Sequence, residues 1–215
     1  MLTKRLEKIA AVLPKCKILA DVGCDHGYIG LEALQRNLAE KVVFIDISAP
    51  SLQKANMHCG AEYQSRASFV CQNGLQNVCC DCAVIAGMGG LEIISVLNGA
   101  AALPQFLVLQ PMRSQQDVRR FLQKNYNIVS DEKFFDGKFY DLIFAEKQVG
   151  GCSLSQNETT FGKTNLVHPS PDFLQFLQIQ QNKYNQILQQ CNDAEIAEKR
   201  DDVNRILATI MEEPK

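Results

Sequence analysis

The segment Ile18–Tyr28 constrains the fold more strongly than any other part of this sequence. A short apolar run, Ile18–Val22, leads into glycines at positions 23 and 27, and a helix-compatible stretch begins at Ile29. This order is typical of a first β-strand that passes into a helix around a nucleotide-sized ligand. Glycines let the backbone approach such a ligand closely, and free backbone N–H groups point at it. The segment therefore predicts the start of an α/β sheet.

The glycine turn differs from the dinucleotide fingerprint G-x-G-x-x-G. Its spacing, Asp21-x-Gly23-x-Asp25-x-Gly27, places a carboxylate where the second phosphate-contacting glycine would stand. A carboxylate there would repel a pyrophosphate, but it would suit a ligand with a cationic amino-acid end. The turn therefore favours S-adenosylmethionine over NAD as the cofactor.

Apolar runs alternate with helical patterns through the first two thirds of the chain. A hairpin signal follows, in which Asp136-Gly137-Lys138 joins two further strands. This order predicts a mainly parallel α/β sheet with an antiparallel edge. Ligands of such sheets bind beyond the carboxyl ends of the strands, so the first four strand ends are the informative ones. The predicted strands are 18–22, 41–47, 68–72, 82–85, 106–109, 126–135 and 139–147.

The last third of the chain has a different pattern. Residues 149–169 are polar and are interpreted as a connector, and Ser170-Pro171-Asp172 then supplies the cap and first turn of a helix. Two stretches of apolar residues at four-three spacing predict an antiparallel, coiled-coil-like helical hairpin. The expected division is a cofactor-binding domain over residues 1–150 and a connector plus hairpin over 151–215. The sequence leaves open whether the hairpin projects as a coiled pair or serves as a dimerisation arm.

Charge and hydropathy exclude several classes of protein. The net charge of −2 gives no global attraction to nucleic acid, so any nucleic-acid surface must be a local basic patch. No stretch approaches the roughly 20 continuous apolar residues that cross a bilayer, and the first residues lack the apolar core of a signal peptide. We therefore expect a cytoplasmic protein with no membrane partner.

Nine cysteines suggest a metal site or disulfides, but their placement argues against both. Only Cys79-Cys80-Asp81-Cys82 is clustered, and its C-x-x-C has no second cysteine pair or nearby histidine to complete a tetrahedral site. The thiols are expected to be small buried apolar side chains, and no metal is expected.

Two turns carry candidate adenosine-binding residues. Asp46 lies near the end of the second predicted strand, about 20 residues past the glycine turn, where a carboxylate can accept both ribose hydroxyls. The alternative is a helix cap before Pro50, but Ser48 can fill that role. Asn73-Gly74 could present an amide to the adenine edge, although Asn-Gly is also a common turn pair.

The run Ala86-Gly-Met-Gly-Gly90 ends the fourth predicted strand with few side chains. It leaves room for a flat group against the backbone, although a flexible loop is the alternative interpretation. Methyltransferases that act on exocyclic amines often carry an Asn/Asp-Pro-Pro-aromatic run here, so its absence indicates different chemistry at the acceptor nitrogen. His26 and Tyr28 flank the glycine turn, and we expect His26 to contact the ligand rather than to act as an acid or base.

The sequence contains, in order, the motifs Thr-Lys-Arg-Leu, Asp-Val-Gly-Cys-Asp-His-Gly-Tyr, Asn-Gly-Leu, Val-Ile-Ala-Gly-Met-Gly-Gly, Leu-Gln-Pro and Asp-Gly-Lys-Phe-Tyr-Asp. Together these motifs resemble the bacterial tRNA (adenine-N1)-methyltransferases that modify adenine 22. The resemblance covers nearly the whole chain, including the C-terminal hairpin. It implies a class I methyltransferase domain, S-adenosylmethionine as the methyl donor and tRNA as the partner. We separately expect a monomer or weak homodimer, although the sequence does not determine the oligomeric state.

By position, the resemblance also implies a set of cofactor-binding residues. Those at the methionine end are Asp21, Gly23, Cys24, Asp25, His26, Gly27 and Tyr28; those at the ribose are Asp46 and Ile47; those at the adenine are Asn73 and Gly74; and those beside the methyl group are Ala86, Gly87 and Met88. Asp25 is also the candidate catalytic residue, because a nearby carboxylate would stabilise a cationic product.

Adenine N1 carries a lone pair and no proton at neutral pH, so the reaction needs positioning and a dry pocket more than a base. A paired target adenine must first be opened. Two alternatives remain: a class I methyltransferase for another substrate, to which the hairpin would be superfluous, or a non-catalytic nucleotide-binding module. The candidate contacts to tRNA phosphates are Arg5, Arg113, Arg119, Arg120, Lys138, Lys183, Lys199 and Arg200.

Overall fold

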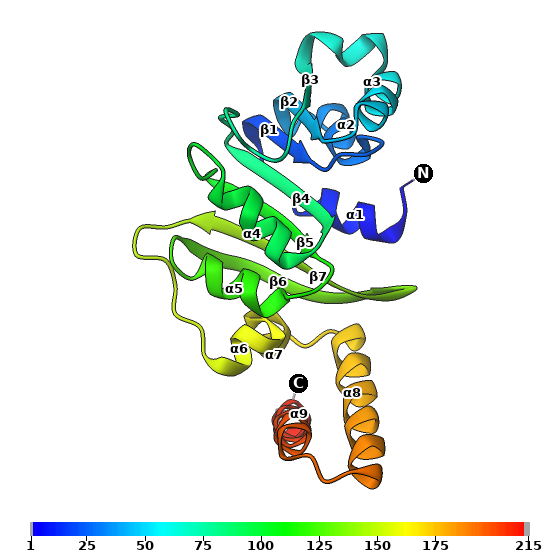
Figure 1. Ribbon diagram of the computed structural model, residues 1–215, viewed down its shortest axis with the longest axis vertical. Coiled ribbons are helices and arrows are strands. Elements are labelled where there is room, and N and C mark those ends of the chain that lie inside the picture. Colours follow the sequence, from blue (N-terminus) through cyan, green and yellow to red (C-terminus); the bar gives the residue numbers. More distant parts are fainter. Residues whose placement is uncertain (1, 213–215) are drawn as a thin grey trace.

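The computed structural model describes residues 2–212 and has a seven-stranded sheet at its centre (Figure 1). The strand order is β3-β2-β1-β4-β5-β7-β6. Strands β1 to β5 run parallel, whereas β7 is antiparallel to both β5 and β6. The predicted parallel sheet with an antiparallel edge is confirmed. The strands are β1 (Cys16–Val22), β2 (Ala39–Asp46), β3 (Ala67–Cys71), β4 (Cys82–Met88), β5 (Phe106–Pro111), β6 (Tyr126–Asp136) and β7 (Lys138–Lys147).

Helices cover both faces of the sheet. Successive residues of β2 point to opposite faces. Phe44 packs in the core between the sheet and α1, α2 and α3, whereas Ile45 packs in the core between the sheet and α4 and α5. Because both faces are covered, the parallel strands read as nearly continuous apolar runs in the sequence. The helices on the sheet are α1 (Lys4–Ala11), α2 (Tyr28–Gln35), α3 (Ala49–Tyr63), which continues into the 3₁₀ turn η1 (Gln64–Arg66), α4 (Gly90–Asn98) and α5 (Gln115–Leu122).

Two short helices, α6 (Gln156–Phe161) and α7 (Lys163–Val167), occupy the segment expected to be an ill-defined connector. They dock on the edge strand β6. Thr164 Oγ1 accepts the Asp131 backbone N–H at 2.9 Å, and Asn165 Oδ1 accepts that of Lys133 at 2.8 Å. The pairing satisfies backbone groups that an open sheet edge would leave exposed. Helices this short depend on such packing, which explains why their own sequence gave little signal.

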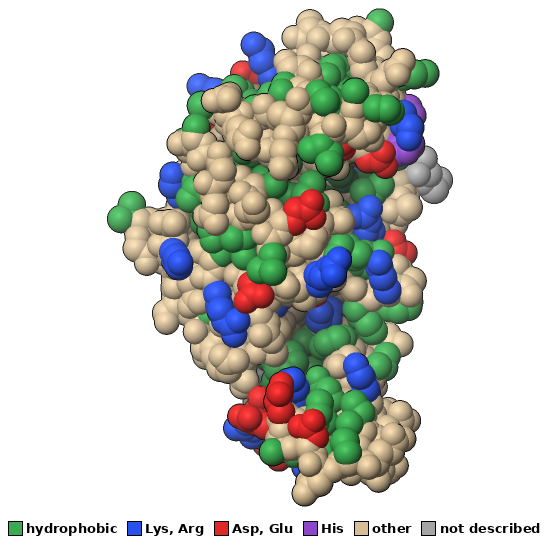
Figure 2. Space-filling model, in the orientation of Figure 1, with side chains coloured by type: hydrophobic (Ala, Val, Ile, Leu, Met, Phe, Trp, Pro, Cys, Tyr) green, Lys and Arg blue, Asp and Glu red, His purple; other side chains and the backbone are tan. Residues whose placement is uncertain are grey.

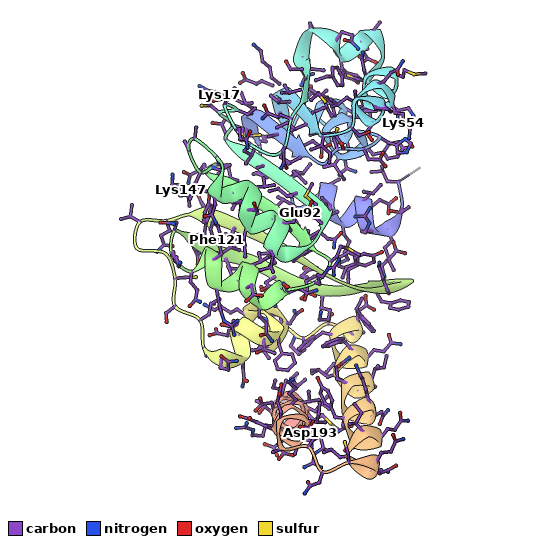
Figure 3. The ribbon with its side chains drawn as sticks, in the orientation of Figure 1. Lys17, Lys54, Glu92, Phe121, Lys147 and Asp193 are labelled. Carbon is purple, nitrogen blue, oxygen red and sulfur yellow. The ribbon has the colours of Figure 1, made fainter. Side chains whose placement is uncertain are left out.

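The C-terminal helices α8 (Pro171–Gln190) and α9 (Ala194–Glu212) are joined at residues 191–193, and Figure 3 labels Asp193 at this turn. Helix α8 begins where predicted, with Ser170 Oγ accepting the Phe173 N–H at 3.1 Å. The two helices share a small apolar core made by Phe161, Phe173, Leu177, Val203, Ile206 and Leu207. The boundary between the two expected domains and the role of the hairpin stay predictions. No helix within residues 2–212 is long and apolar enough to cross a membrane.

A buried ion network lies between α5 and the antiparallel strands. Arg119, which is 0% exposed, donates to both carboxylate oxygens of Asp131 at 2.7 and 2.9 Å and to Asp141 at 2.7 Å. Lys133 also pairs with Asp141. Burial opposes the ionisation of Asp141, but these two cations outweigh it and hold its pKa below the ordinary value. The predicted contact of Arg119 with tRNA phosphates is therefore wrong, because its charge is enclosed and fully paired.

Candidate active site

The candidate site lies where the carboxyl ends of β1, β2, β3 and β4 meet. The register places Val22 level with Ile45 and Ile85 on the neighbouring strands, so the following turns converge. Two cavities open at this edge, one of about 360 Å³ and one of about 220 Å³. Val22 and Gly23 line both of them. The glycine turn thus separates two adjoining compartments.

The turn after β1 has a backbone that few residue types adopt. Gly23, Asp25 and Gly27 have φ angles of +69°, +45° and +70°. A Cβ at position 23 would lie 2.2 Å from Met88 Cε, so a side chain there would displace Met88. Asp25 carries a positive φ without being glycine, which is an uncommon and strained arrangement. The shape of the turn therefore favours glycine at positions 23 and 27, whereas Asp25 is held in its conformation by the surrounding structure.

Asp21 is a buried carboxylate at the end of β1, and it lines the larger cavity. Its Oδ2 accepts the Gly30 N–H at 2.9 Å, at the start of α2. Burial, with a smaller contribution from the nearby Asp46 carboxylate, raises the pKa of Asp21 to about 7. A cation placed in this cavity would return the group to its ionised form, so the site favours a cationic ligand at neutral pH.

Asp46 lines the smaller cavity and links the turns after β1 and β2 by hydrogen bonds. Its Oδ2 accepts the Asp25 N–H at 3.0 Å, and its Oδ1 accepts the Ser48 N–H at 2.8 Å. Each carboxylate oxygen has a further lone pair, so both remain able to accept a hydroxyl. Ser48 caps α3 by accepting the Ser51 N–H, as expected from the sequence. Asp46 is thus not needed as the cap.

Three rings form a cluster at the rim of the larger cavity. The centroids of His26, Tyr28 and His58 lie 5.4, 5.5 and 5.2 Å apart pairwise, with planes inclined by 7° to 21°. The His58 Nδ1 atom lies 3.0 Å from the His26 carbonyl oxygen, so the neutral or protonated ring can donate to it. Within residues 2–212, His26 Nδ1 is buried and has no hydrogen-bond partner. Such an orphaned polar atom beside a cavity is a position that a ligand can satisfy.

The cavities contain nearly all the residues that the sequence suggested for cofactor binding. Gly27 is the exception: a Cβ there would lie 2.8 Å from Ala55 Cβ, so this glycine serves the packing of α2 on α3. The larger cavity is lined by Asp21, Gly23, Cys24, Asp25, His26, Tyr28, Ala86 and Gly87, and the smaller one by Gly23, Asp46, Ile47, Asn73, Gly74 and Met88.

Sequence reasoning missed several lining residues. Arg5 and Leu6 reach the larger cavity from α1, and Glu92, labelled in Figure 3, lines the smaller one from α4. His58 joins the ring cluster from α3, 32 residues from its partner His26. None of these four stands in a strand-end turn, so no local pattern pointed to them as ligand contacts.

Among the described residues 2–212, no three potential metal ligands converge. The expectation that the cysteines are buried holds for Cys24, Cys59 and Cys82, whereas Cys71, Cys79 and Cys191 are exposed.

The residues present fit S-adenosylmethionine. The larger cavity offers carboxylates, a guanidinium and an orphaned ring nitrogen, which suit the charged amino-acid end of that molecule. The smaller cavity offers the Asp46 carboxylate and the Asn73 amide, which suit an adenosine. The side-chain-free Gly23 lies between them, where a ligand spanning both compartments must pass close to the backbone.

Comparison with known proteins gives consistent matches. The methyltransferase domain family matches residues 2–143. A Mycoplasma pneumoniae protein named "Putative tRNA methyltransferase" is 34% identical over 158 residues, which are 66% of this chain and 70% of that one. The tRNA (adenine(22)-N1)-methyltransferase of Bacillus subtilis is 30% identical over 154 residues, covering 67% and 65% of the two chains.

A solved structure extends the likeness to the C-terminal helices. It is the Streptococcus pneumoniae protein described as a "putative tRNA (m1A22) methyltransferase, in complex with S-adenosyl-L-methionine". The two chains are 28% identical and superpose with a TM-score of 0.86 over 96% of this chain and 100% of the other. The likeness therefore covers the sheet, its antiparallel edge and the helices beyond it.

Proposed function

Because the chain belongs to the methyltransferase domain family and, within it, to the bacterial tRNA (adenine(22)-N1)-methyltransferases, we propose that it methylates N1 of adenine 22 in tRNA, with S-adenosylmethionine as donor. The observation that carries the proposal is the pair of cavities joined at Gly23, with a buried carboxylate in one and a ribose-compatible carboxylate in the other. The donor supplies an electrophilic methyl group on a positively charged sulfur.

Each compartment has a distinct binding role in this proposal. Asp21 holds the ammonium group of the donor's methionine end, because its carboxylate is ionised most readily beside a cation. Asp46 accepts the ribose hydroxyls, and Asn73 with Gly74 contacts the adenine edge. Ala86, Gly87 and Met88 form the wall beside the methyl group. Ala86 and Gly87 have little or no side chain and leave room for a second, flat group in the larger cavity.

The acceptor needs positioning more than activation. Adenine N1 has a free lone pair, so the protein must present the base in line and exclude water. The pairing edge of the base must be free of its partner, and the parallel faces of His26 and Tyr28 at the cavity rim suit an unpaired base. The Asp25 side chain is 63% exposed and lies 3.5 Å from His26 Nε2. Its proposed role is to stabilise the positive charge of the methylated base.

The charge distribution indicates which surface meets tRNA. Figure 2 shows basic side chains over the sheet part and acidic ones gathered on the C-terminal helices. Glu195, Glu198 and Asp202 of α9 line a cleft against the sheet domain, where they would repel phosphates. Arg113 is exposed beside the glycine loop that ends β4. We propose that tRNA approaches over Arg113 and that the protein acts in the cytoplasm, where tRNA is modified.

A methyl-transfer assay tests the proposed function. Purified protein is incubated with radiolabelled S-adenosylmethionine and a tRNA transcript that carries adenine 22, and the digested nucleosides are separated. The expected product is 1-methyladenosine. A transcript with guanine at position 22 is the matched control and should take up no label. Label in a different nucleoside, or equal label in both transcripts, would contradict the assignment.

A further inference from the structure

A further cavity, of about 470 Å³, lies between α1 and α2 and adjoins the larger cavity of the candidate site. Figure 1 shows α1 next to α2, against which it packs. Leu6 and Tyr28 line both this α1–α2 cavity and the larger cavity. The two cavities therefore meet at these two side chains, and a flexible molecule that leaves the larger cavity past Tyr28 enters the α1–α2 cavity.

The walls of the α1–α2 cavity are mainly apolar. Leu2 and Leu6 line it from the N-terminal side, and Leu31 lines it from α2. All three leucines are only half-buried, and the Tyr28 side chain is 42% exposed. A flat group with apolar faces would cover these side chains and gain free energy from their burial, as a nucleobase does on an aromatic ring.

Two polar side chains at one end of the cavity have free hydrogen-bonding capacity. Gln35 is exposed, and within residues 2–212 its side-chain amide forms no hydrogen bond. Glu32 Oε1 accepts the Arg36 Nε–H at 2.5 Å, which leaves Oε2 able to accept another donor. An amide and a carboxylate oxygen together complement the edge of a base that carries an exocyclic amine.

The charge of the cavity suits a base better than a phosphate. No lysine or arginine is among the described residues that line it, and Glu32 is the acidic one. The carboxylate would repel a phosphate group, since the Arg36 guanidinium that balances its charge lies outside the lining.

The neighbour of the target base has few places to go. A target adenine whose pairing edge is presented in the larger cavity has left the base stack, so its neighbour in the chain has lost a stacking partner. A single phosphodiester joins the two nucleotides, which keeps the neighbour at the rim of the larger cavity. The smaller cavity beyond Gly23 is assigned to the adenosine of the donor, whereas the α1–α2 cavity is open on the Tyr28 side.

We infer that the α1–α2 cavity binds the base of the nucleotide next to the target adenine in tRNA. The leucines and the Tyr28 ring cover the faces of this base, and Glu32 with Gln35 binds its amine-bearing edge. The inference rests on the proposed function, because it names a second contact of the same substrate. It gives α1 and α2 a role in tRNA selection that is separate from donor binding.

Photo-crosslinking tests the occupant directly. Gln35 is replaced by the photoreactive amino acid p-benzoylphenylalanine in the full-length protein, which is irradiated with a tRNA transcript and S-adenosylhomocysteine. Reverse transcription then maps the crosslinked nucleotide. We expect a crosslink to the nucleotide immediately before or after adenine 22. The same replacement at Gln148, which is exposed and outside all three cavities, should give no crosslink there.

Steady-state kinetics test the walls and the polar end separately. Leu31→Trp fills the cavity and should raise the KM for tRNA roughly 5- to 100-fold, the range expected when a stacked base is lost. Gln35→Ala removes one hydrogen-bonding group and should raise that KM roughly three- to tenfold. Neither residue lines the larger or the smaller cavity, so the affinity for S-adenosylmethionine in calorimetry should change by less than about twofold.

Ile179→Trp is the matched control for the added ring. Ile179 is 46% exposed on α8 and lines none of the three cavities, so the KM for tRNA should stay unchanged. Equal effects of Ile179→Trp and Leu31→Trp would overturn the inference.

The outcomes separate this inference from the proposed function. Crosslinks only to nucleotides distant from adenine 22, or an unchanged KM in both Leu31→Trp and Gln35→Ala, would overturn the role of the cavity while methylation by the wild-type protein continues. A parallel loss of donor affinity in these variants would show a structural effect and overturn it as well. If the wild-type protein methylates no adenine-22 transcript, the proposed function itself fails.

Discussion

Two charged regions of this molecule use the same residue types in opposite ways. In the network around Arg119, every charge is enclosed and faces an opposite charge of the protein. At the carboxyl edge of the sheet, the side chains of Asp21 and Asp46 accept hydrogen bonds from backbone N–H groups, and the side chain of Arg5 donates one to a neutral amide. None of these three side chains forms an ion pair among the described residues. The first arrangement serves folding, and the second leaves charges available to a ligand.

The backbone of the two regions differs at one place, the turn after β1. Arg119 lies on a regular helix and Asp141 in the middle of a strand, so their positions follow from ordinary secondary structure. At the site, Asp21, Asp46 and Arg5 also lie on regular elements, whereas Asp25 lies in a turn with three positive φ angles in five residues. Such strain is tolerated where the surrounding structure holds it and where function requires the shape.

The largest expected effect is on folding. Arg119→Ala leaves two carboxylates buried near each other without their main cation, and it should lower the free energy of unfolding by about 3–5 kcal/mol. Urea denaturation measures this. Arg120→Ala is the matched control, because Arg120 is exposed and pairs with Asp117 on its own helix; its effect should stay within about 0.5 kcal/mol. Similar losses in the two variants would remove the distinction between the regions.

The next effect is on donor binding. Asp46→Ala removes the proposed acceptor of the ribose hydroxyls and should weaken S-adenosylmethionine binding by roughly 10- to 100-fold in calorimetry. Asp81→Ala is the control at the opposite end of the sheet. Asp81 also accepts two backbone N–H groups, those of Lys17 and Ile18, but it lies outside both cavities. Donor affinity that falls equally in both variants would indicate a general structural effect.

A smaller effect should be the dependence of donor affinity on pH. Burial raises the pKa of Asp21 to about 7, and only the ionised carboxylate attracts an ammonium group. Donor affinity should therefore fall as the pH decreases from 7.5 to 6, with a limit of about tenfold per unit below the pKa. In Asp21→Asn the affinity should be lower and almost independent of pH over this range. A flat wild-type profile would show that Asp21 does not bind the cation.

The smallest effect concerns tRNA. Arg113→Ala should weaken tRNA binding roughly three- to tenfold and reduce the slope of log affinity against log salt by about one. Lys199→Ala should change neither, because Lys199 pairs with Glu195 and lies beside other acidic residues of α9. Filter binding over a series of salt concentrations measures both quantities. A larger effect at Lys199 would move the tRNA surface to the C-terminal helices.

The same contrast explains what the sequence could predict. The glycine turn and Asp46 could be predicted from the sequence, because strand ends and glycine spacing are local patterns. The parallel sheet then brings the strand ends together. The burial of Arg119 could not be predicted, because its partners Asp131 and Asp141 lie on the strands β6 and β7. An arginine on an amphipathic helix has the same local pattern whether it meets water or two carboxylates.

Long-range contacts also hid part of the site. Arg5 lies on the helix α1, but the position of its side chain at the cavity depends on Gln110, which is 105 residues away. His58 reaches the ring cluster only because α3 packs beside α2. The helices α6 and α7 depend on β6 in the same way. These features follow from tertiary packing, which no window of the sequence contains.

The central claim is that one donor molecule spans the two cavities, with its amino-acid end beside Asp21 and its sugar at Asp46. The most direct measurement is a crystal structure of the protein grown with S-adenosylhomocysteine. We expect electron density that crosses Gly23, with the ribose oxygens within hydrogen-bond distance of Asp46. Density in the reverse orientation, or confined to the cleft under α9, would contradict it.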